Sequence, residues 1–347
     1  MRQELSEQDL RLIHAVQVSP RAPWTTVGPA CGMHPITAAR RWQRLVDRGL
    51  VSVLVTPGPA LLRRLATAYL DVECPPSDRE AVIAALLVDP RVASITIAGS
   101  GRSLFLTLMA ASHQALADLV LARIETLPGV LRTELYPITQ VYGEGSSWRL
   151  DALARSEIRG LDRRSPRAPR PFAVSERHRA LFRALSLDAR APVAALAEQV
   201  GESPSTTSRR VAAMLASGLV SIRCDVTQEA AGWPILVNYF LRVPAAELDA
   251  VGRALAALPE NRGSFAVAAR PNLFASQWLR HVSDVPYGEA RMTGAIPSLE
   301  VLDRMVALRV VKRMGRVLDA DGRSIGVVPL DPWHESVVTP PAVTDRS

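Results

Sequence analysis

The first fifty-six residues place apolar side chains at helical spacing, with short turns between the helical stretches. A helix should open at Ser6, because Asp9 stands at the acidic position of a capping box. Further helices are expected over residues 25–31 and 35–47. A strand over residues 50–55 should follow and begin a wing.

The same pattern returns after residue 174, where Gly201 marks the turn before the third helix. The second copy predicts three helices and a strand, over residues 175–185, 193–200, 204–217 and 219–223. Three short helices followed by a strand are typical of a winged helix-turn-helix, whose third helix enters the DNA major groove.

Each of these segments is followed by alternating strand patterns and amphipathic helices in the order β-α-β-β-α-β. In the first copy these elements are expected over residues 67–73, 78–87, 90–98, 104–110, 112–127 and 130–141. In the second copy they are expected over residues 235–243, 246–258, 264–269, 272–282, 284–295 and 299–311. This order predicts a ferredoxin-like domain, so the fold class is α+β.

An internal repeat explains why the order occurs twice. Residues 21–23 (Arg-Ala-Pro) recur as residues 190–192, and residues 49–52 (Gly-Leu-Val-Ser) recur as residues 218–221. Both pairs are 169 positions apart, which indicates duplication of one two-part unit. We therefore divide the chain into helix-turn-helix units 4–56 and 174–227, ferredoxin-like units 64–145 and 233–315, a linker 146–173 and an extension 316–347.

The segments outside the repeats have simpler patterns. Residues 147–161 predict a short amphipathic helix, and residues 163–171 are rich in arginine and proline, as in an extended spacer. An alternative is that this basic stretch contacts phosphates. Asp321-Gly322 predicts a hairpin turn, and the proline-rich end after it is expected to be disordered.

The composition suggests a kind of binding partner but does not locate a binding site. The 347 residues carry a net charge of +7, and 41 basic residues include a single lysine, Lys312. A basic chain suggests nucleic acid or an anionic membrane surface as partner, although a GC-rich genome also favours arginine. Three well-separated cysteines show no metal-ligand or disulfide spacing. Without a signal peptide or an apolar run of membrane-spanning length, we expect a cytoplasmic protein.

The sequence contains no catalytic constellation. Six histidines are scattered, and no Ser-His-Asp or Cys-His spacing recurs in both copies. A phosphate-binding GxxxxGK[ST] loop is absent. We therefore expect no enzyme activity, no metal site and no cofactor.

The two third helices carry the residues expected to contact DNA. Small hydroxyl residues stand in the first turn of the second copy, with an Arg-Arg pair behind them in both copies. Hydroxyls at a helix N-terminus suit phosphate contacts, and arginine can bind guanine bidentately. An Arg-Arg pair can also be only a solvated helix face. The expected DNA-contacting residues are Thr37, Arg40, Arg41, Arg44, Ser205, Thr206, Ser208, Arg209 and Arg210.

This arrangement resembles the Lrp/AsnC family of transcriptional regulators, in a tandem, double-length form. Residues 201–220 follow the family's recognition-helix pattern, and Asp9 and Gly49 also match it. The resemblance covers residues 4–142 and 174–315. It implies that paired ferredoxin-like sheets bind a small effector, often an amino acid, near a loop with the pattern Gly-x-Tyr-Asp.

Both copies depart from that loop pattern, because the first copy has arginine and the second has asparagine in place of aspartate. Arginine would suit a carboxylate or phosphate better than an amino group. The expected effector-binding residues are Gly99, Ser100, Gly101, Arg102, Arg270 and Asn272. The alternative is a vestigial pocket in a domain that only dimerises.

The resemblance implies a ligand-responsive regulator that binds double-stranded DNA as a fused pseudo-dimer, with further self-association left open and no membrane partner. Two alternatives remain. One is an enzyme resembling the sirohaem decarboxylases, in which His113 and Arg102 would be the pocket histidine and arginine that such enzymes need. The other is a nucleoid-type protein that binds DNA with little sequence preference, which a specificity ratio at fixed salt would reveal.

Overall fold

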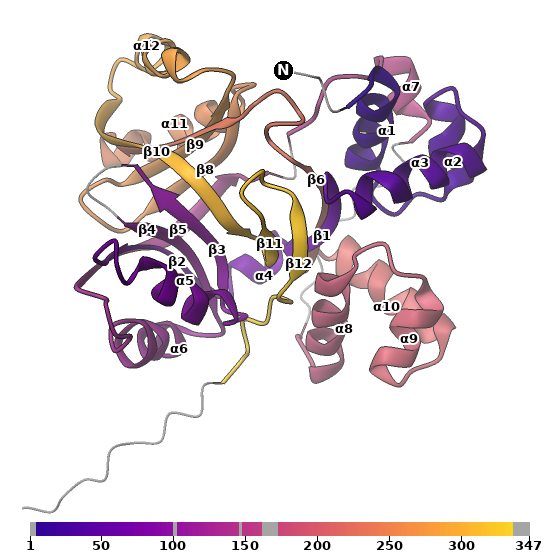
Figure 1. Cartoon of the computed structure of the whole chain (residues 1–347), viewed down its shortest axis with the longest axis horizontal. Coiled ribbons are helices and arrows are strands. Elements are labelled where there is room, and N and C mark those ends of the chain that lie inside the picture. The colour runs from indigo at the N-terminus through magenta and orange to yellow at the C-terminus, as the bar shows by residue number, and fades with distance from the viewer. Residues whose placement is uncertain (1–4, 100–102, 146–147, 162–172, 336–347) are drawn as a thin grey trace, which may run out of the picture.

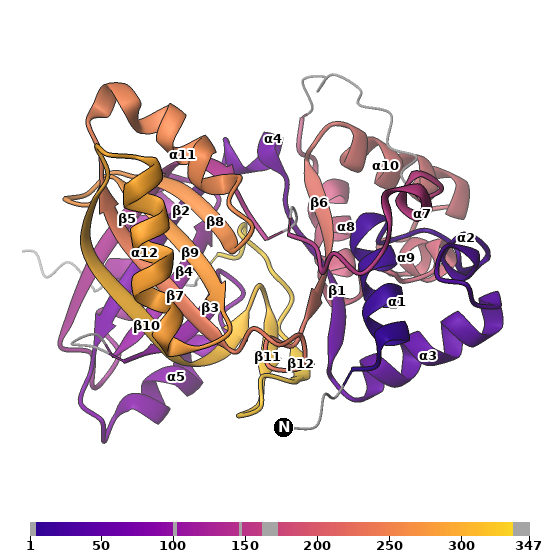
Figure 2. The same cartoon turned by 90° about the horizontal axis from the view of Figure 1, so that it is seen from above.

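The computed structural model describes residues 5–99, 103–145, 148–161 and 173–335 (Figure 1). These residues form the expected α+β fold, with the helix-turn-helix units on one side and the βαββαβ units on the other (Figure 2). Within these ranges no helix is both long and apolar enough to span a bilayer.

Each repeat begins with three helices and a strand. In the first repeat these are α1 (Glu7–Val18), α2 (Trp24–Ala30), α3 (Pro35–Asp47) and β1 (Val51–Pro57). In the second they are α8 (Glu176–Leu187), α9 (Val193–Val200), α10 (Pro204–Ala216) and β6 (Val220–Val226). Ser6 and Asp9 form the expected capping box at α1. The buried residues of the third helices are those that helical spacing predicts: Ala38, Trp42, Leu45, Thr207, Val211 and Met214.

The strand expected to begin a wing instead joins the two repeats. β1 pairs antiparallel with β6, from Val51 opposite Val226 to Pro57 opposite Val220. Six of the seven β1 residues are buried, so other elements must pack against both faces of this strand. Helix α8 of the second repeat packs against β1, and α1 of the first repeat packs against β6. The two helix-turn-helix units therefore form one interlocked block.

Two equivalent arginines strengthen this block. The guanidinium of Arg21 donates to the backbone carbonyls of Ala189 and Ala191, the latter at 3.0 Å. In return Arg190 donates to the carbonyls of Pro20 and Ala22, the latter at 3.0 Å. These arginines occupy matching positions in the two repeats, so we refer to them as the reciprocal arginine pair.

The ferredoxin-like units follow the predicted order with shifted boundaries. The first contains β2 (Ala66–Glu73), α5 (Arg79–Leu87), β3 (Val92–Ala98), β4 (Leu104–Ala110), α6 (His113–Asp118), the π-helical turn η1 (Leu119–Ile124) and β5 (Arg132–Gly143). The second contains β7 (Ile235–Arg242), η2 (Ala245–Glu247), α11 (Leu248–Ala256), β8 (Asn261–Val267), β9 (Leu273–Leu279), η3 (Val282–Asp284), α12 (Val285–Ala295) and β10 (Glu300–Arg313). The short helix α4 (Pro59–Leu62) precedes β2.

The expectation for β8 was wrong at its start, because the strand begins at Asn261 rather than at residue 264. Asn261 and Arg262 are polar, which hides the strand pattern, yet Asn261 is buried in the structure. This shift brings Arg262 into the sheet.

The two sheets close into an eight-stranded barrel in the order β10-β3-β4-β2-β5-β8-β9-β7, with β7 pairing back to β10. Two long strands make this closure. The first half of β5 pairs with β2 of its own repeat, and its second half pairs with β8 of the other. Strand β10 does the same with β7 and β3. The expected pseudo-dimer is thus joined along both sheet edges.

The helix expected over residues 147–161 was wrong over most of its length, since only α7 (Arg155–Arg159) is helical among the described residues there. The backbone N–H groups of Leu150, Ala152 and Leu153 bind the side chains of Gln17 and His14 on α1 instead of a helical carbonyl. The basic stretch over residues 163–171 lies outside the described residues.

The C-terminal extension forms the predicted hairpin and then returns to the second helix-turn-helix unit. Strands β11 (Arg316–Leu318) and β12 (Ser324–Val327) flank the turn. Beyond them, Asp331 forms an ion pair of 3.0 Å with Arg183 of α8, and Trp333 contacts Phe182 edge-on. The expectation of a disordered proline-rich end was wrong for residues 328–335, because Leu330 is 1% exposed and Asp331 is held by Arg183. Positions 336–347 lie outside the described residues.

Candidate functional site

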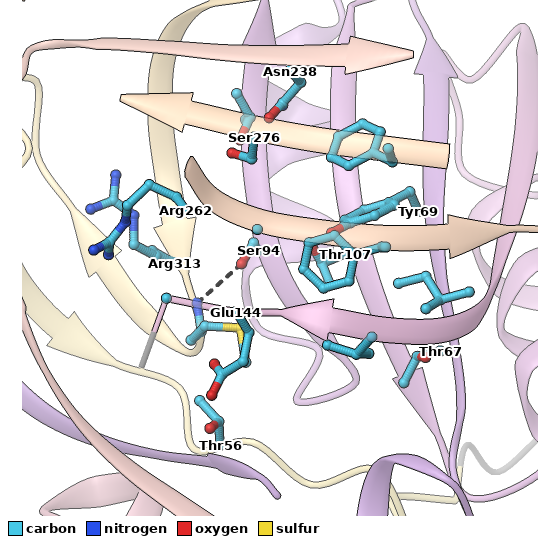
Figure 3. Close-up of a pocket in the computed structure, with 18 of the residues that line it drawn as sticks. Thr56, Thr67, Tyr69, Ser94, Thr107, Glu144, Asn238, Arg262, Ser276 and Arg313 are labelled. Atoms are coloured by element: carbon cyan, nitrogen blue, oxygen red, sulfur yellow. Dashed lines mark hydrogen bonds between the residues drawn. The ribbon is translucent and has the colours of Figure 1, made fainter. Parts of the chain in front are cut away.

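A cavity of about 190 Å³ lies inside the barrel, next to β1 and β6. Its walls are largely aromatic, and hydroxyl and amide groups of both sheets also point into it (Figure 3). The aromatic lining residues are Tyr69, Phe105, Phe265, Phe274 and Trp278. The polar uncharged ones include Thr67, Ser94, Thr96, Thr107, Asn238 and Ser276. Such a mixture of apolar walls and a few convergent polar groups is typical of small-molecule sites.

Three arginines lie at one end of this cavity. Arg223 comes from β6, Arg262 from β8 and Arg313 from β10, and Figure 3 shows the last two side by side, away from Tyr69. They come from three separate segments of the chain, which only barrel closure brings together. We call Arg223, Arg262 and Arg313 the arginine cluster.

Two carboxylates partly neutralise the arginine cluster. Asp225 lies 3.0 Å from Arg223 and 3.6 Å from Arg262, and Glu144 lies 3.4 Å from Arg223. The cluster thus has three guanidinium groups against two carboxylates. Arg223 is the best paired, because it contacts both acids.

Burial and charge shift the pKa values of these groups in different directions. Burial lowers the pKa of Arg262 to about 9 and that of Arg313 to about 10, although Asp225 opposes both shifts. Burial also acts to lower the pKa of Arg223, but the charges of Asp225 and Glu144 outweigh it and raise that pKa. For Arg262 and Arg313 the effect of burial on the pKa thus exceeds the opposing effect of Asp225.

Arg262 has an unusual environment among the residues that the structure describes. Its guanidinium lies 3.8 Å from the ring centre of Trp278 and 4.6 Å from that of Trp148. The side chain is 8% exposed. Its contacts with the described residues are these rings and the ion pair with Asp225, and none of them is a hydrogen bond.

The backbone also approaches this end closely. A methyl group on Gly145 would lie 2.6 Å from Nη1 of Arg223 and 3.2 Å from Nη2 of Arg262. Only glycine therefore fits at this position without displacing the guanidinium groups.

A second, larger cavity of about 520 Å³ adjoins the first and shares Leu62, Thr67, Ile138 and Glu144 with it. Its lining includes Tyr142, whose hydroxyl donates to Asp249 at 2.7 Å. We call the two spaces the inner and the outer cavity.

None of the described residues expected from the effector loop lines the inner cavity. The backbone N–H of Gly99 donates to Val306, and Arg270 is exposed on the surface. The amide of Asn272 binds both the N–H and the carbonyl of Val243, which is a structural contact. Ser100, Gly101 and Arg102 lie outside the described residues, so the role of this loop stays a prediction.

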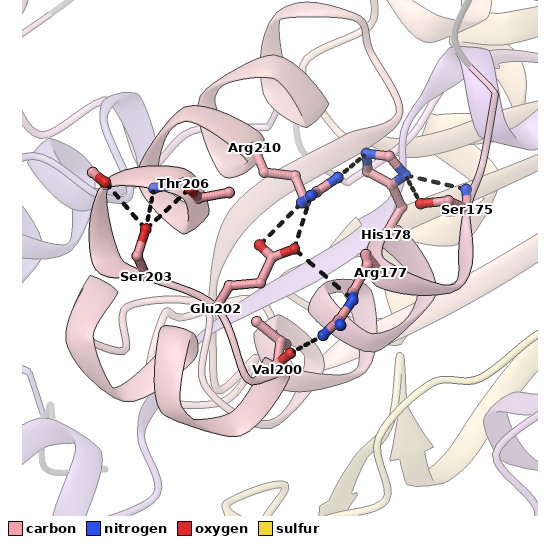
Figure 4. Close-up of polar contacts among 9 residues, drawn as sticks. Ser175, Arg177, His178, Val200, Glu202, Ser203, Thr206 and Arg210 are labelled. Carbon is pink, nitrogen blue, oxygen red and sulfur yellow. Dashed lines mark hydrogen bonds and ion pairs between the residues drawn. The ribbon is translucent and has the colours of Figure 1, made fainter.

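In the third helix of the second repeat, α10, the two adjacent arginines have different surroundings. Arg210 donates to Glu202 at 2.8 Å and lies 3.3 Å from the ring of His178, as Figure 4 shows. Arg209 is exposed. Ser203 caps the helix by accepting from the N–H of Thr206. Ser205 and Ser208 are exposed beside Arg209.

The first recognition helix, α3, shows the same difference. Arg41 donates to Asp9 at 2.6 Å and to Gln8 at 2.9 Å, both on α1. Thr37, Arg40 and Arg44 are exposed. In both repeats the second arginine thus holds the recognition helix against the first helix, while the first arginine faces solvent.

Sequence reasoning missed the whole inner cavity. Nothing in the local pattern separates the arginine cluster from the other arginines, and Trp148 and Trp278 fit an ordinary core equally well. A usable signal was the pair Asn261 and Arg262 directly before an apolar strand, where polar residues interrupt a buried element.

The fold defines a class: two helix-turn-helix units in tandem with two ferredoxin-like units that close into one barrel. A family model described as the AsnC-type helix-turn-helix domain matches residues 179–215. No curated protein sequence is similar enough to match the chain.

Solved structures resemble the fold over nearly its whole length. A crystal structure of the sirohaem decarboxylase NirDL has a TM-score of 0.57 at 12% identity, covering 92% of this chain and 95% of that one. A second NirDL structure, in complex with an iron-uroporphyrin III analogue, has a TM-score of 0.55 at 13% identity, covering 89% and 93%. AsnC from E. coli matches 39% of this chain and 93% of its own at 18% identity, with a TM-score of 0.35. At these identities the likeness concerns the fold.

Proposed function

We propose that the chain is a DNA-binding transcriptional regulator whose DNA affinity depends on a small ligand in the inner cavity. The observation that carries the proposal is that the two adjacent arginines of each recognition helix have different surroundings. Arg41 and Arg210 hold the helices in place, which leaves Arg40 and Arg209 exposed with neighbouring polar side chains. Solvated arginine and hydroxyl groups on a third helix are suited to a major groove.

The link between ligand and DNA would run through β6. Arg223 lines the inner cavity, and the same strand pairs with β1 inside the helix-turn-helix block. A ligand that shifted Arg223 or Asp225 would therefore act on the strand that connects the two recognition helices. Such a shift changes DNA affinity only if the ligand binds the two arrangements unequally.

Arg209 and Arg210 provide the matched pair that tests DNA binding. Replacing Arg209 by alanine should weaken binding to sequences selected from random DNA by about 1–3 kcal/mol if it reads a base. Replacing Arg210 should lower the thermal stability as well, because Glu202 loses its ion pair of 2.8 Å and keeps the longer one of 4.0 Å with Arg177. Fluorescence anisotropy at fixed salt measures the first effect, and thermal unfolding measures the second.

The exposed Arg270, in the turn between β8 and β9, serves as a charge control, and its alanine variant should bind DNA as the parent does. A parent protein that selects no preferred sequence would contradict the proposal and support the nucleoid-type alternative. An Arg209→Ala effect equal on all sequences would reduce Arg209 to a phosphate contact.

An enzyme of the same architecture is the second candidate, and the full-length likeness to sirohaem decarboxylase favours it. Two features of the inner cavity point the other way. Its described lining contains no histidine, and His113 is exposed at the start of α6. Its volume of about 190 Å³ is also below the usual range for drug-sized ligands, roughly 300–1,000 Å³.

Incubation with sirohaem separates the two candidates. A regulator should leave the Soret absorbance unchanged and release no carbon dioxide. A shifted Soret band together with carbon dioxide release would establish the second candidate, with the macrocycle in the outer cavity.

A further inference from the structure

We propose that Arg262 binds the carboxylate of the ligand in the inner cavity, and that this ligand is a small carboxylate with a ring-sized apolar body and no ammonium group. The regulatory role of such a ligand rests on the proposed function. Its binding does not, because occupation of the inner cavity can be measured in the absence of DNA.

The first argument is the unsatisfied guanidinium. A buried arginine normally donates several hydrogen bonds, since each unmet donor in a dry site costs free energy. Arg262 is 8% exposed, lines the inner cavity and makes no hydrogen bond to the described residues. A carboxylate in the cavity would accept two parallel hydrogen bonds from its planar fork.

The second argument is that Arg262 is held ready for a ligand. The ring centres of Trp278 and Trp148 lie 3.8 Å and 4.6 Å from its guanidinium, so cation–π contacts with both rings hold the group beside the cavity. The neighbouring arginines are engaged elsewhere, because Arg223 contacts Asp225 and Glu144, and Arg313 donates to Gln228. Arg262 thus has the most donor capacity left.

The third argument is charge. The arginine cluster exceeds its two carboxylates by one positive charge, and burial already lowers the pKa of Arg262 to about 9. One anionic group in the inner cavity would therefore neutralise the remaining positive charge of the arginine cluster. A ligand ammonium would add a second uncompensated cation, and Glu144, the carboxylate of the described lining, is already paired with Arg223.

The fourth argument is size. A cavity of roughly 150 Å³ with apolar walls holds a benzene molecule. The inner cavity has about 190 Å³, and beyond the arginine cluster its wall combines rings such as Tyr69, Phe265 and Phe274 with hydroxyl groups such as those of Thr67 and Thr107. This space fits a benzene-sized body with a short acidic arm reaching Arg262.

Three related probes test the proposal: phenylacetate, phenylglycine with an added ammonium, and 2-phenylethanol with a hydroxyl in place of the carboxylate. Isothermal titration calorimetry on the full chain should show that phenylacetate binds at least about tenfold more tightly than either of the others. Because Trp148 and Trp278 flank Arg262, phenylacetate should also change the tryptophan fluorescence.

Variants assign the effect to Arg262. R262Q should weaken phenylacetate binding at least about tenfold, since it removes the charge and the bidentate donor. R242Q is the matched control, because Arg242 is exposed at the end of β7 and lines neither cavity, and it should bind phenylacetate as the parent does. If R262Q fails to fold, the double variant D225N/R262Q, which removes one charge of each sign, takes the place of R262Q in the assay.

The outcomes are distinct. Equal binding of phenylacetate by R262Q and the parent, loss of binding in R242Q, or tighter binding of phenylglycine would each overturn the proposal. Phenylacetate binding that depends on Arg262 but leaves DNA affinity unchanged would support the ligand site and contradict the proposed function.

Discussion

At the scale of single residues, Lys312 shows how far burial can move a group from its ordinary behaviour. It is the one lysine of the chain and is 0% exposed. Its ammonium group donates to the carbonyls of Leu87 at 2.8 Å and Asp89 at 2.9 Å, at the end of α5. Burial lowers its pKa from 10.5 to about 8, although the charge of Asp89 opposes the shift.

This shift predicts a pH dependence of stability with a definite sign. Between pH 8 and 10.5 the unfolded chain keeps the lysine proton that the folded chain has lost, so the free energy of unfolding rises with pH. Relative to K312M, the parent should gain roughly 3 kcal/mol across this window, at 1.36 kcal/mol per pKa unit. Urea unfolding at pH 7 to 11 measures it.

Arg309→Met is the control, because Arg309 is an exposed residue of the same strand and should show no such trend. Parallel stability curves for the parent and K312M would mean that the Lys312 pKa is unshifted.

At the scale of elements, the reciprocal arginine pair and the β1–β6 pairing make one block of two helix-turn-helix units. Arg21 and Arg190 each donate to two carbonyls of the other repeat, and Arg190 also lies 4.2 Å from the ring centre of Trp24. Burial lowers the pKa of Arg190 to about 10.

Arg21→Ala and Arg190→Ala should each lower the free energy of unfolding by about 2–3 kcal/mol, because hydrogen bonds to charged groups are worth about 1.5–3 kcal/mol. The double variant should cost less than the sum, since the first change already loosens the contact between the units. Urea unfolding of the three variants measures this coupling. Strict additivity would show that the two contacts act independently.

At the scale of the whole molecule, fusion frees the two recognition helices to differ. Ile36, Ala39 and Arg44 of α3 correspond to Ser205, Ser208 and Ala213 of α10, and Ile36 is 58% exposed. A regulator built in this way should select two unequal half-sites one helical turn or a multiple of it apart.

Copying the second helix surface onto the first tests this prediction. The variant I36S/A39S/R44A should shift the sequences selected from random DNA towards a symmetric palindrome. The buried Ala38 is left unchanged, so the helix core is preserved. A parent protein that already selects a perfect palindrome would contradict the prediction.

Much of this molecule follows from local sequence. The capping box at Ser6, the inward faces of α3 and α10 and the βαββαβ order depend on neighbouring residues, and each was predicted. The internal repeat, which is visible when the sequence is compared with itself, also predicted the two-part architecture. These features are local because helix periodicity, strand alternation and caps involve residues a few positions apart.

Tertiary structure alone decided the sites. β1 pairs with β6, β5 with β8 and β10 with β3, and these long-range pairings create the inner cavity. They also surround Arg262, one arginine among forty, with two tryptophan rings beside the inner cavity. Within the second helix-turn-helix unit, packing sets Arg210 against Glu202 and His178 while Arg209 stays exposed. The exposure and the partners of a side chain depend on which distant segments pack over it, and the spacing of residues in the sequence does not reveal this.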